Sequence, residues 1–174
     1  MRYPTLMFLA AALCSASGCS PKAPEKQTPQ VPANQIQTPT MTQDTRDPST
    51  LTYAPALNVQ IDKMTRTPSG LYYFDRVVGT GALAEKGKKV FMGYVGSMPD
   101  GRVFDQSGPG TPYPVVLGRG AVIAGWDEGI IGMKVGGKRL LVVPPLLAYG
   151  NASPGAGIPP NATLVFEVSL EKVE

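Results

Sequence analysis

The chain has 174 residues, of which 43% are hydrophobic and 17% are charged, and its net charge is +3. This length corresponds to about one domain with a buried core, and the small charge excess gives no support for nucleic-acid binding. Histidine is absent, and both cysteines, Cys14 and Cys19, stand near the start of the chain. The remainder has no thiol nucleophile, no disulfide and no Cys/His metal site, which excludes most hydrolases and metalloenzymes. We expect neither a metal nor a cofactor.

The first 18 residues have the order of an export signal. Arg2 gives a positive start, an apolar run over 6–13 follows, and small residues lead to Cys19. The run is too short to span a bilayer as a helix. The ending Ala-Ser-Gly-Cys at 16–19 resembles a bacterial lipoprotein cleavage site, although a leucine is usual at Ala16. We therefore expect a lipoprotein-type signal peptide over 1–18, a lipid anchor on Cys19, and a membrane-anchored protein facing the periplasm or the cell exterior.

Two other outcomes of processing stay open at this point. Ordinary cleavage after Gly18 or Ala16 leaves Cys19 as a free thiol and the protein soluble in the periplasm or secreted. An uncleaved signal forms a membrane anchor by itself.

A proline-rich segment follows the signal. Six prolines stand between Ser20 and Thr52, together with many Gln and Thr and few large apolar residues. Such a segment buries too little apolar surface to offset the entropy of ordering it, so we expect it to be extended and mobile. The alternating apolar residues over 57–61 leave open that this part docks on the domain as a strand. We predict a disordered tether over 19–65 and a folded domain over 66–174.

From Ser69 onward, short β-rich runs are separated by glycine. We predict strands over 71–78, 89–98, 102–105, 112–117, 138–143 and 164–171. The pair Asp100-Gly101 predicts a hairpin between the second and third runs. One stretch has helical spacing, with its apolar face formed by Val122, Ile123, Trp126, Ile130 and Met133. An antiparallel sheet covered by one short helix is an α+β domain.

Six strings of residues within 69–172 resemble the FKBP-type peptidyl-prolyl cis/trans isomerases in order and spacing. They read Ser-Gly-Leu-Tyr-Tyr from Ser69, Gly-Tyr-Val-Gly from Gly93, Asp-Gly-Arg-Val-Phe-Asp from Asp100, Val-Ile-Ala-Gly-Trp from Val122, Pro-Pro-Leu-Leu-Ala-Tyr-Gly from Pro144 and Ile-Pro-Pro-Asn-Ala-Thr-Leu-Val-Phe from Ile158. The resemblance implies a curved antiparallel sheet of five to six strands wrapped around one short α-helix.

The resemblance also implies which residues form the site. The catalytic set is Tyr94, Phe104, Asp105, Trp126, Tyr149 and Phe166. The substrate-binding set is Val122, Ile123, Tyr113 and Ile158. In this assignment Trp126 is the floor of a proline pocket, and the backbone N–H of Ile123 and the phenol of Tyr149 donate to substrate carbonyls. By residue type alone, the aromatic residues are also ordinary core residues and Asp105 an ordinary turn residue.

The implied activity is catalysis of X–Pro isomerisation, which needs no proton donor and no nucleophile. The implied partners are proline-containing polypeptides and the macrolide inhibitors tacrolimus and rapamycin, and we expect a monomer. The loop 106–111 lacks the arginine that pairs with the rim acid in several family members, so the surroundings of Asp105 stay open. The alternative function is a non-catalytic binding module or holdase chaperone that uses the same fold.

Overall fold

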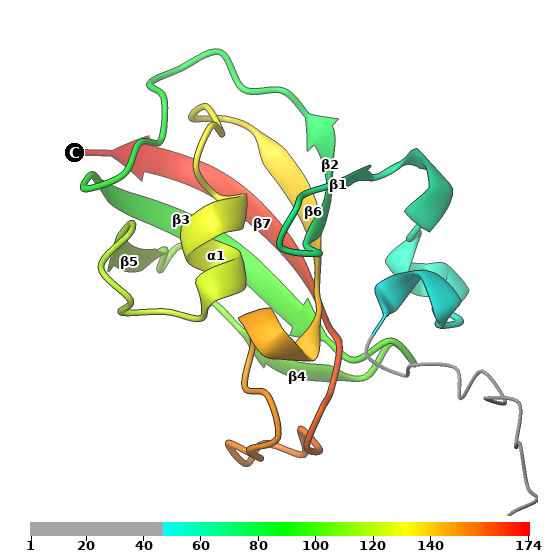
Figure 1. Ribbon diagram of the computed structural model, residues 1–174. Coiled ribbons are helices and arrows are strands. Elements are labelled where there is room, and N and C mark those ends of the chain that lie inside the picture. Colours follow the sequence, from blue (N-terminus) through cyan, green and yellow to red (C-terminus); the bar gives the residue numbers. More distant parts are fainter. Residues whose placement is uncertain (1–46) are drawn as a thin grey trace, which may run out of the picture. The chain divides into compact units, whose positions relative to one another are not determined.

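Seven antiparallel strands and one short α-helix form the part of the chain that the structure, a computed structural model, describes, residues 47–174 (Figure 1). The strands are β1 (Thr65–Arg66), β2 (Tyr72–Val77), β3 (Lys89–Ser97), β4 (Val103–Gln106), β5 (Tyr113–Val116), β6 (Lys138–Val143) and β7 (Leu164–Val173), and the helix is α1 (Ala124–Gly129). Their order in the sheet is β1-β2-β6-β7-β3-β4, with β5 also paired to β3. The α+β prediction is confirmed: the six predicted runs are observed as β2 to β7, and the two-residue β1 brings the sheet to seven strands.

Strand β3 organises the part of the sheet that carries the site. It pairs with β7 along one edge, while β5 and β4 pair in turn with its other edge. The predicted Asp-Gly hairpin joins β3 to β4: the N–H of Gly101 donates to Met98 O, and Gly101 adopts a φ of 92°, which glycine adopts without strain. Side chains of β3, β4, β5 and β7 thereby reach a common region beside α1.

Helix α1 lies against the concave face of the sheet and approaches β6 closely (Figure 1). A Cβ on Gly125 would stand 2.5 Å from Cγ1 of Val143, and one on Gly129 would stand 2.8 Å from Cδ2 of Leu141. The two glycines, four residues apart, therefore face β6 and let the backbones come together. The main hydrophobic core lies here, with Trp126 buried in it.

Residues 47–65 differ from the prediction that they belong to a disordered tether. They form three 3-10 turns (Pro48–Thr50, Pro55–Leu57 and Ile61–Lys63). The second hydrophobic cluster consists of Met64, Tyr72, Leu140, Val142 and Val165, and Tyr53, Leu57, Val59 and Ile61 pack against it. The apolar residues within 53–64 thus cover side chains that β2, β6 and β7 present away from the main core. The folded domain begins at or before residue 47 rather than at 66.

Residues 1–46 lie outside the described part of the chain. The predicted signal peptide, Cys19 and the earlier part of the predicted tether all fall there. Among residues 47–174, no helix has the length and apolar character needed to cross a membrane.

Candidate active site

A cavity of about 460 Å³ opens beside α1 and is lined from several strands at once. Its walls are Tyr94, Phe104, Asp105, Tyr113, Ala121, Val122, Ile123, Trp126, Tyr149 and Phe166. The structure therefore brings together all six residues of the predicted catalytic set and three of the four in the predicted substrate-binding set. Ala121 is the one lining residue that the sequence reasoning missed.

Five aromatic rings form a continuous series around the cavity. The ring centroids of Tyr94 and Trp126 lie 4.8 Å apart, those of Trp126 and Phe166 lie 5.2 Å apart, and Phe104 follows at 5.7 Å from Phe166. Tyr113 closes the other end, 5.9 Å from Tyr94. Every pair is edge to face, the arrangement that the ring quadrupole favours. The result is a concave apolar surface with Trp126 and Phe166 buried in its floor.

Gly96 on β3 makes room for two of these rings. A Cβ at this position would stand 2.8 Å from Cζ of Phe104 and 2.9 Å from Cε1 of Phe166. Real Cβ atoms do not approach other atoms so closely, so both rings would have to move. The absence of a side chain at Gly96 is therefore part of the cavity's shape. The sequence signal was the glycine itself, standing two residues after Tyr94 within a predicted strand.

The rim acid Asp105 is held by neutral donors. The phenol of Tyr94 donates to its Oδ2 at 2.7 Å, and the backbone N–H of Gln106 donates to Oδ1 at 2.9 Å. No ion pair to Asp105 exists within residues 47–174. Burial raises the pKa of the Tyr94 phenol far above its usual range, and the hydrogen bond to Asp105 and its negative charge add to the shift. Tyr94 therefore stays a proton donor at neutral and moderately alkaline pH.

The lip of the cavity is the short segment that precedes α1. Asp127 on α1 accepts hydrogen bonds from the N–H groups of Gly118 and Gly120, both at 2.9 Å, and so holds the start of this segment against the helix. Ile123 is the residue before the first turn of α1. In the described part of the chain its N–H makes no hydrogen bond, so it is available to a ligand carbonyl. Asp127 is a supporting residue that the sequence reasoning did not identify.

Ile158 does not line the cavity, although it was assigned to the substrate-binding set. Its side chain is buried in the main hydrophobic core, and its N–H donates to Gly155 O. The hydroxyl of Ser153 also donates to Ile158 O at 2.6 Å. Ile158 thus anchors the loop 150–158 from beneath. The family resemblance placed Ile158 in the substrate-binding set, whereas its side chain packs in the main core and not in the cavity.

Tyr149 stands at the cavity mouth, following the 3-10 turn Pro145–Leu147. It is 40% exposed, and its phenol makes no hydrogen bond to any other described residue. No cluster of three or more potential metal ligands occurs in the described residues. The site offers an apolar floor, the backbone N–H of Ile123 and the phenols of Tyr113 and Tyr149, which suit binding and orienting a neutral ligand.

Comparison with known proteins gives a consistent result. A family model described as FKBP-type peptidyl-prolyl cis-trans isomerase matches residues 81–171. The chain is 49% identical over 108 residues to FK506-binding protein 4 of Rhizopus delemar and 50% identical over 103 residues to that of Dictyostelium discoideum. The matches cover 62% and 59% of this chain but 28% of each relative, so the chain spans under a third of the length of these curated relatives.

Solved structures match the same part of the chain. The crystal structure of AtFKBP13 has a TM-score of 0.58 and 40% identity, covering 64% of this chain and 99% of that one. The crystal structure of FkpA from Escherichia coli has a TM-score of 0.59 and 42% identity, covering 64% of this chain and 51% of that one. The match thus takes in almost all of the AtFKBP13 chain and about half of the FkpA chain.

Proposed function

Because the chain belongs to the family of FKBP-type peptidyl-prolyl cis-trans isomerases, we propose that it catalyses rotation about X–Pro bonds and assists the folding of exported proteins. The substrate is a proline-containing polypeptide segment. We assign the roles predicted from the resemblance to Tyr94, Phe104, Asp105, Trp126, Tyr149 and Phe166 as catalytic residues. Val122, Ile123 and Tyr113 bind the flanking chain.

The chemistry of this reaction suits an apolar cavity. The planar peptide bond resists rotation by about 18–20 kcal/mol because its C–N bond is conjugated. Rotation breaks the conjugation and leaves a less charge-separated amide, which an apolar surface favours over the planar form. Each tenfold gain in rate needs only about 1.4 kcal/mol of this preference. No proton transfer is required, so the absence of histidine is no obstacle.

The observation that carries this proposal is the series of aromatic rings around one cavity whose lip has an unused backbone N–H. The prolyl ring packs on Trp126, while the N–H of Ile123 and the phenol of Tyr149 hold substrate carbonyls on either side.

A protease-coupled isomer assay on a fragment of residues 47–174 tests the activity directly. We expect faster cis-to-trans conversion of tetrapeptides with one X–Pro bond, and a preference for an apolar residue before proline, next to Val122 and Ile123. A rate equal to that of buffer alone, from a fragment with cooperative unfolding, would support the non-catalytic binding module instead.

We further propose that tacrolimus, also called FK506, and rapamycin bind in the same cavity and inhibit the activity, and that the protein is a monomer. Two curated relatives are named FK506-binding proteins, and an apolar cavity of about 460 Å³ is of the size that binds small molecules. Calorimetry with each macrolide tests the first point and sedimentation the second. Absence of binding at saturating macrolide would contradict the assignment of the cavity.

For localisation we propose that Cys19 carries lipid and anchors the protein to a membrane, facing the periplasm or the cell exterior. The order of Arg2, the apolar run 6–13 and the small residues before Cys19 supports this. Stable attachment takes more than one acyl chain, so we expect the mature protein in the membrane fraction with a mass increase on Cys19. The Cys19→Ala variant should leave that fraction or accumulate uncleaved. A soluble, cleaved wild type with an unmodified thiol would contradict the anchor.

A further inference from the structure

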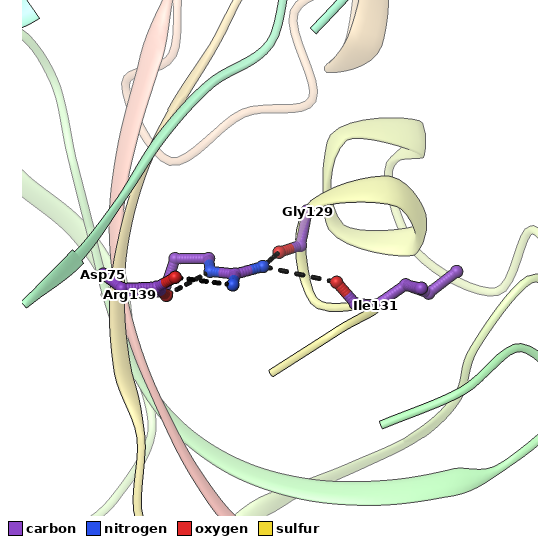
Figure 2. A network of polar contacts seen from close by, with 4 residues as sticks. All are labelled: Asp75, Gly129, Ile131 and Arg139. Atoms are coloured by element: carbon purple, nitrogen blue, oxygen red, sulfur yellow. Dashed lines mark hydrogen bonds and ion pairs between the residues drawn. The ribbon is translucent and has the colours of Figure 1, made fainter. Parts of the chain in front are cut away.

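Arg139 is a buried arginine on β6 whose guanidinium joins three parts of the fold (Figure 2). Its Nε donates to Oδ1 of Asp75 at 2.6 Å, and its Nη2 donates to Oδ2 of the same carboxylate at 2.9 Å. Its Nη1 donates to Gly129 O at 2.8 Å and to Ile131 O at 3.3 Å. Asp75 and Arg139 are directly opposed residues of β2 and β6. One side chain thus connects two strands to the end of α1.

The two carbonyls that Arg139 contacts stand at the C-terminal end of α1, where carbonyl groups have no hydrogen-bond partner within the helix. Gly129 is the last residue of α1, and Ile131 follows two positions later. Carbonyls at a helix C-terminus need outside donors, and a cation is favoured at this end. The bidentate pairing with Asp75 orients the guanidinium, so that Nη1 is aimed at the helix. The ring of Tyr73 lies 4.7 Å from the guanidinium and restricts it further.

Helix α1 is short, and on the side facing β6 it presents two glycines, Gly125 and Gly129. The contact there comes from Val143 and Leu141 of β6, which pack directly on the helix backbone, so the hydrogen bonds from Arg139 are a separate, directional link between the helix and the sheet. Trp126 stands one turn before Gly129, and Ile123 immediately precedes the helix. A shift of this short helix along β6 therefore moves the cavity floor and its lip together.

We propose that Asp75 and Arg139 form a positioning pair that fixes α1 on the sheet and thereby sets the places of Trp126 and Ile123 in the cavity. Neither residue lines the cavity, so the pair acts through the helix and not on the ligand. The catalytic consequence rests on the proposed isomerase function, whereas the placement of Trp126 does not.

The test must separate positioning from stability alone. Replacing a buried ion pair by apolar residues of similar size is often neutral for stability. In the double variant Asp75→Leu with Arg139→Met the ion pair itself should therefore cost little stability, and the loss that remains should come from the carbonyls of Gly129 and Ile131, which lose their donor. We expect the kcat/KM of this variant to fall by roughly ten- to a hundredfold, as small displacements of site groups do. The emission of Trp126, the sole tryptophan of the chain, should shift in the same variant.

A matched control lies one residue away. Arg76 on β2 pairs with Glu167 on β7 and donates to Leu57 O, and it does not contact α1. Leu57 packs against the second hydrophobic cluster, so this pair lies on the face of the sheet away from α1. The double variant Arg76→Met with Glu167→Leu should keep wild-type kcat/KM and wild-type Trp126 emission.

The conservative variant Arg139→Lys keeps the charge but cannot bind Asp75 and both carbonyls at once. The Arg139→Lys variant should therefore show a smaller fall in kcat/KM than the double variant, when both are assayed well below their melting temperatures. If the double variant does not fold, Arg139→Lys is tested in its place. Unchanged kcat/KM and unchanged Trp126 emission in the tested variant would overturn the proposal. If the wild type has no isomerase activity, the positioning role of Asp75 and Arg139 is tested by comparing Trp126 emission and tacrolimus affinity between wild type and variant. Both quantities can be measured without enzyme activity.

Discussion

The phenol of Tyr94 on β3 donates a 2.7 Å hydrogen bond to Oδ2 of Asp105 on β4 and so joins the aromatic wall of the cavity to its rim acid. The sequence had left the surroundings of Asp105 open because the loop after it carries no arginine. The structure shows a neutral partner in place of a charged one. The orientation of Asp105 at the rim is therefore fixed by the phenol of Tyr94 and by the N–H of Gln106.

The variant Tyr94→Phe should release Asp105 while keeping the ring. One hydrogen bond of this kind contributes about 1 kcal/mol, so we expect that loss in the free energy of unfolding and a fall of about fivefold in kcat/KM. Chemical denaturation measures the free energy of unfolding, and the isomer assay measures kcat/KM. The variant Asp105→Asn keeps the acceptor and removes the charge, so it shows which of the two matters. Wild-type kcat/KM in both variants would mean that neither the bond nor the charge serves the reaction.

The raised pKa of Tyr94 gives a prediction about alkaline pH. Burial, chiefly, keeps the phenol protonated in the folded state, whereas an unfolded tyrosine ionises near pH 10. Its contribution to stability is therefore complete below about pH 10 and is lost as the pH rises further. The free energy of unfolding should fall more steeply above pH 10 in the wild type than in Tyr94→Phe. At pH 11 the two folded proteins should show equal phenolate absorbance, and a deficit of one phenolate in the variant would contradict the assignment.

Local signals predicted much of this fold, whereas the site residues were identified through the resemblance to the family. The Asp-Gly pair at 100–101 favours a turn by its residue types alone, and the turn is observed with a positive φ at Gly101. The run 138–143 is observed as β6 with the predicted bounds. The helix proved shorter than its apolar face, because Val122 and Ile123 form the lip before the first turn. The side chains of Val122 and Ile123 pack on the main core although their backbone is not helical. The spacing of apolar residues does not distinguish such a segment from a helix.

The rest depended on contacts between residues far apart in sequence. Residues 53–64 look like part of a tether because the surface they cover, including Leu140 and Val165, is formed only when β6 and β7 pair. Arg139, followed by four apolar residues of β6, has no visible partner in its own segment, since Asp75 lies 64 residues earlier. Composition and spacing within a segment carry no information about such pairings.

The close approach at Gly96 predicts a large effect from one methyl group. Gly96→Ala should push Phe104 and Phe166 apart, at a cost of about 1–3 kcal/mol in unfolding free energy, and should reduce kcat/KM strongly because the cavity floor moves. Thermal melting and the isomer assay measure these effects. In Gly93→Ala, on the same strand, the new Cβ meets the side-chain ends of Ser169 and Glu171, which can turn away, so a much smaller change is expected. Equal effects of the two variants would argue against a specific role of Gly96.

The packing of residues 47–65 predicts that a fragment starting at residue 66 is less stable than one starting at 47. Removing the segment exposes apolar surface of Tyr72, Leu140 and Val165, which should cost about 2 kcal/mol or more and lower the melting temperature by roughly 5–10 °C. Activity per folded molecule should stay the same, because no residue of this segment lines the cavity. Identical melting of the two fragments would show that the segment contributes no stability.

Tyr149 allows binding and packing to be separated within the site. Its phenol is at the mouth of the cavity and makes no hydrogen bond to the other described residues, so Tyr149→Phe removes nothing that the folded domain uses. The free energy of unfolding should change by no more than about 0.5 kcal/mol, as for other exposed positions. A lost hydrogen bond to a substrate carbonyl should lower kcat/KM by about fivefold. Tyr113→Phe is the comparison variant: it removes a phenol of similar exposure from the same cavity, and the assigned role of Tyr113 is contact with the flanking chain and not a hydrogen bond to a carbonyl. If Tyr149→Phe and Tyr113→Phe both retain wild-type kcat/KM, the substrate is held by the apolar floor and the N–H of Ile123, and the phenol of Tyr149 has no part in the reaction.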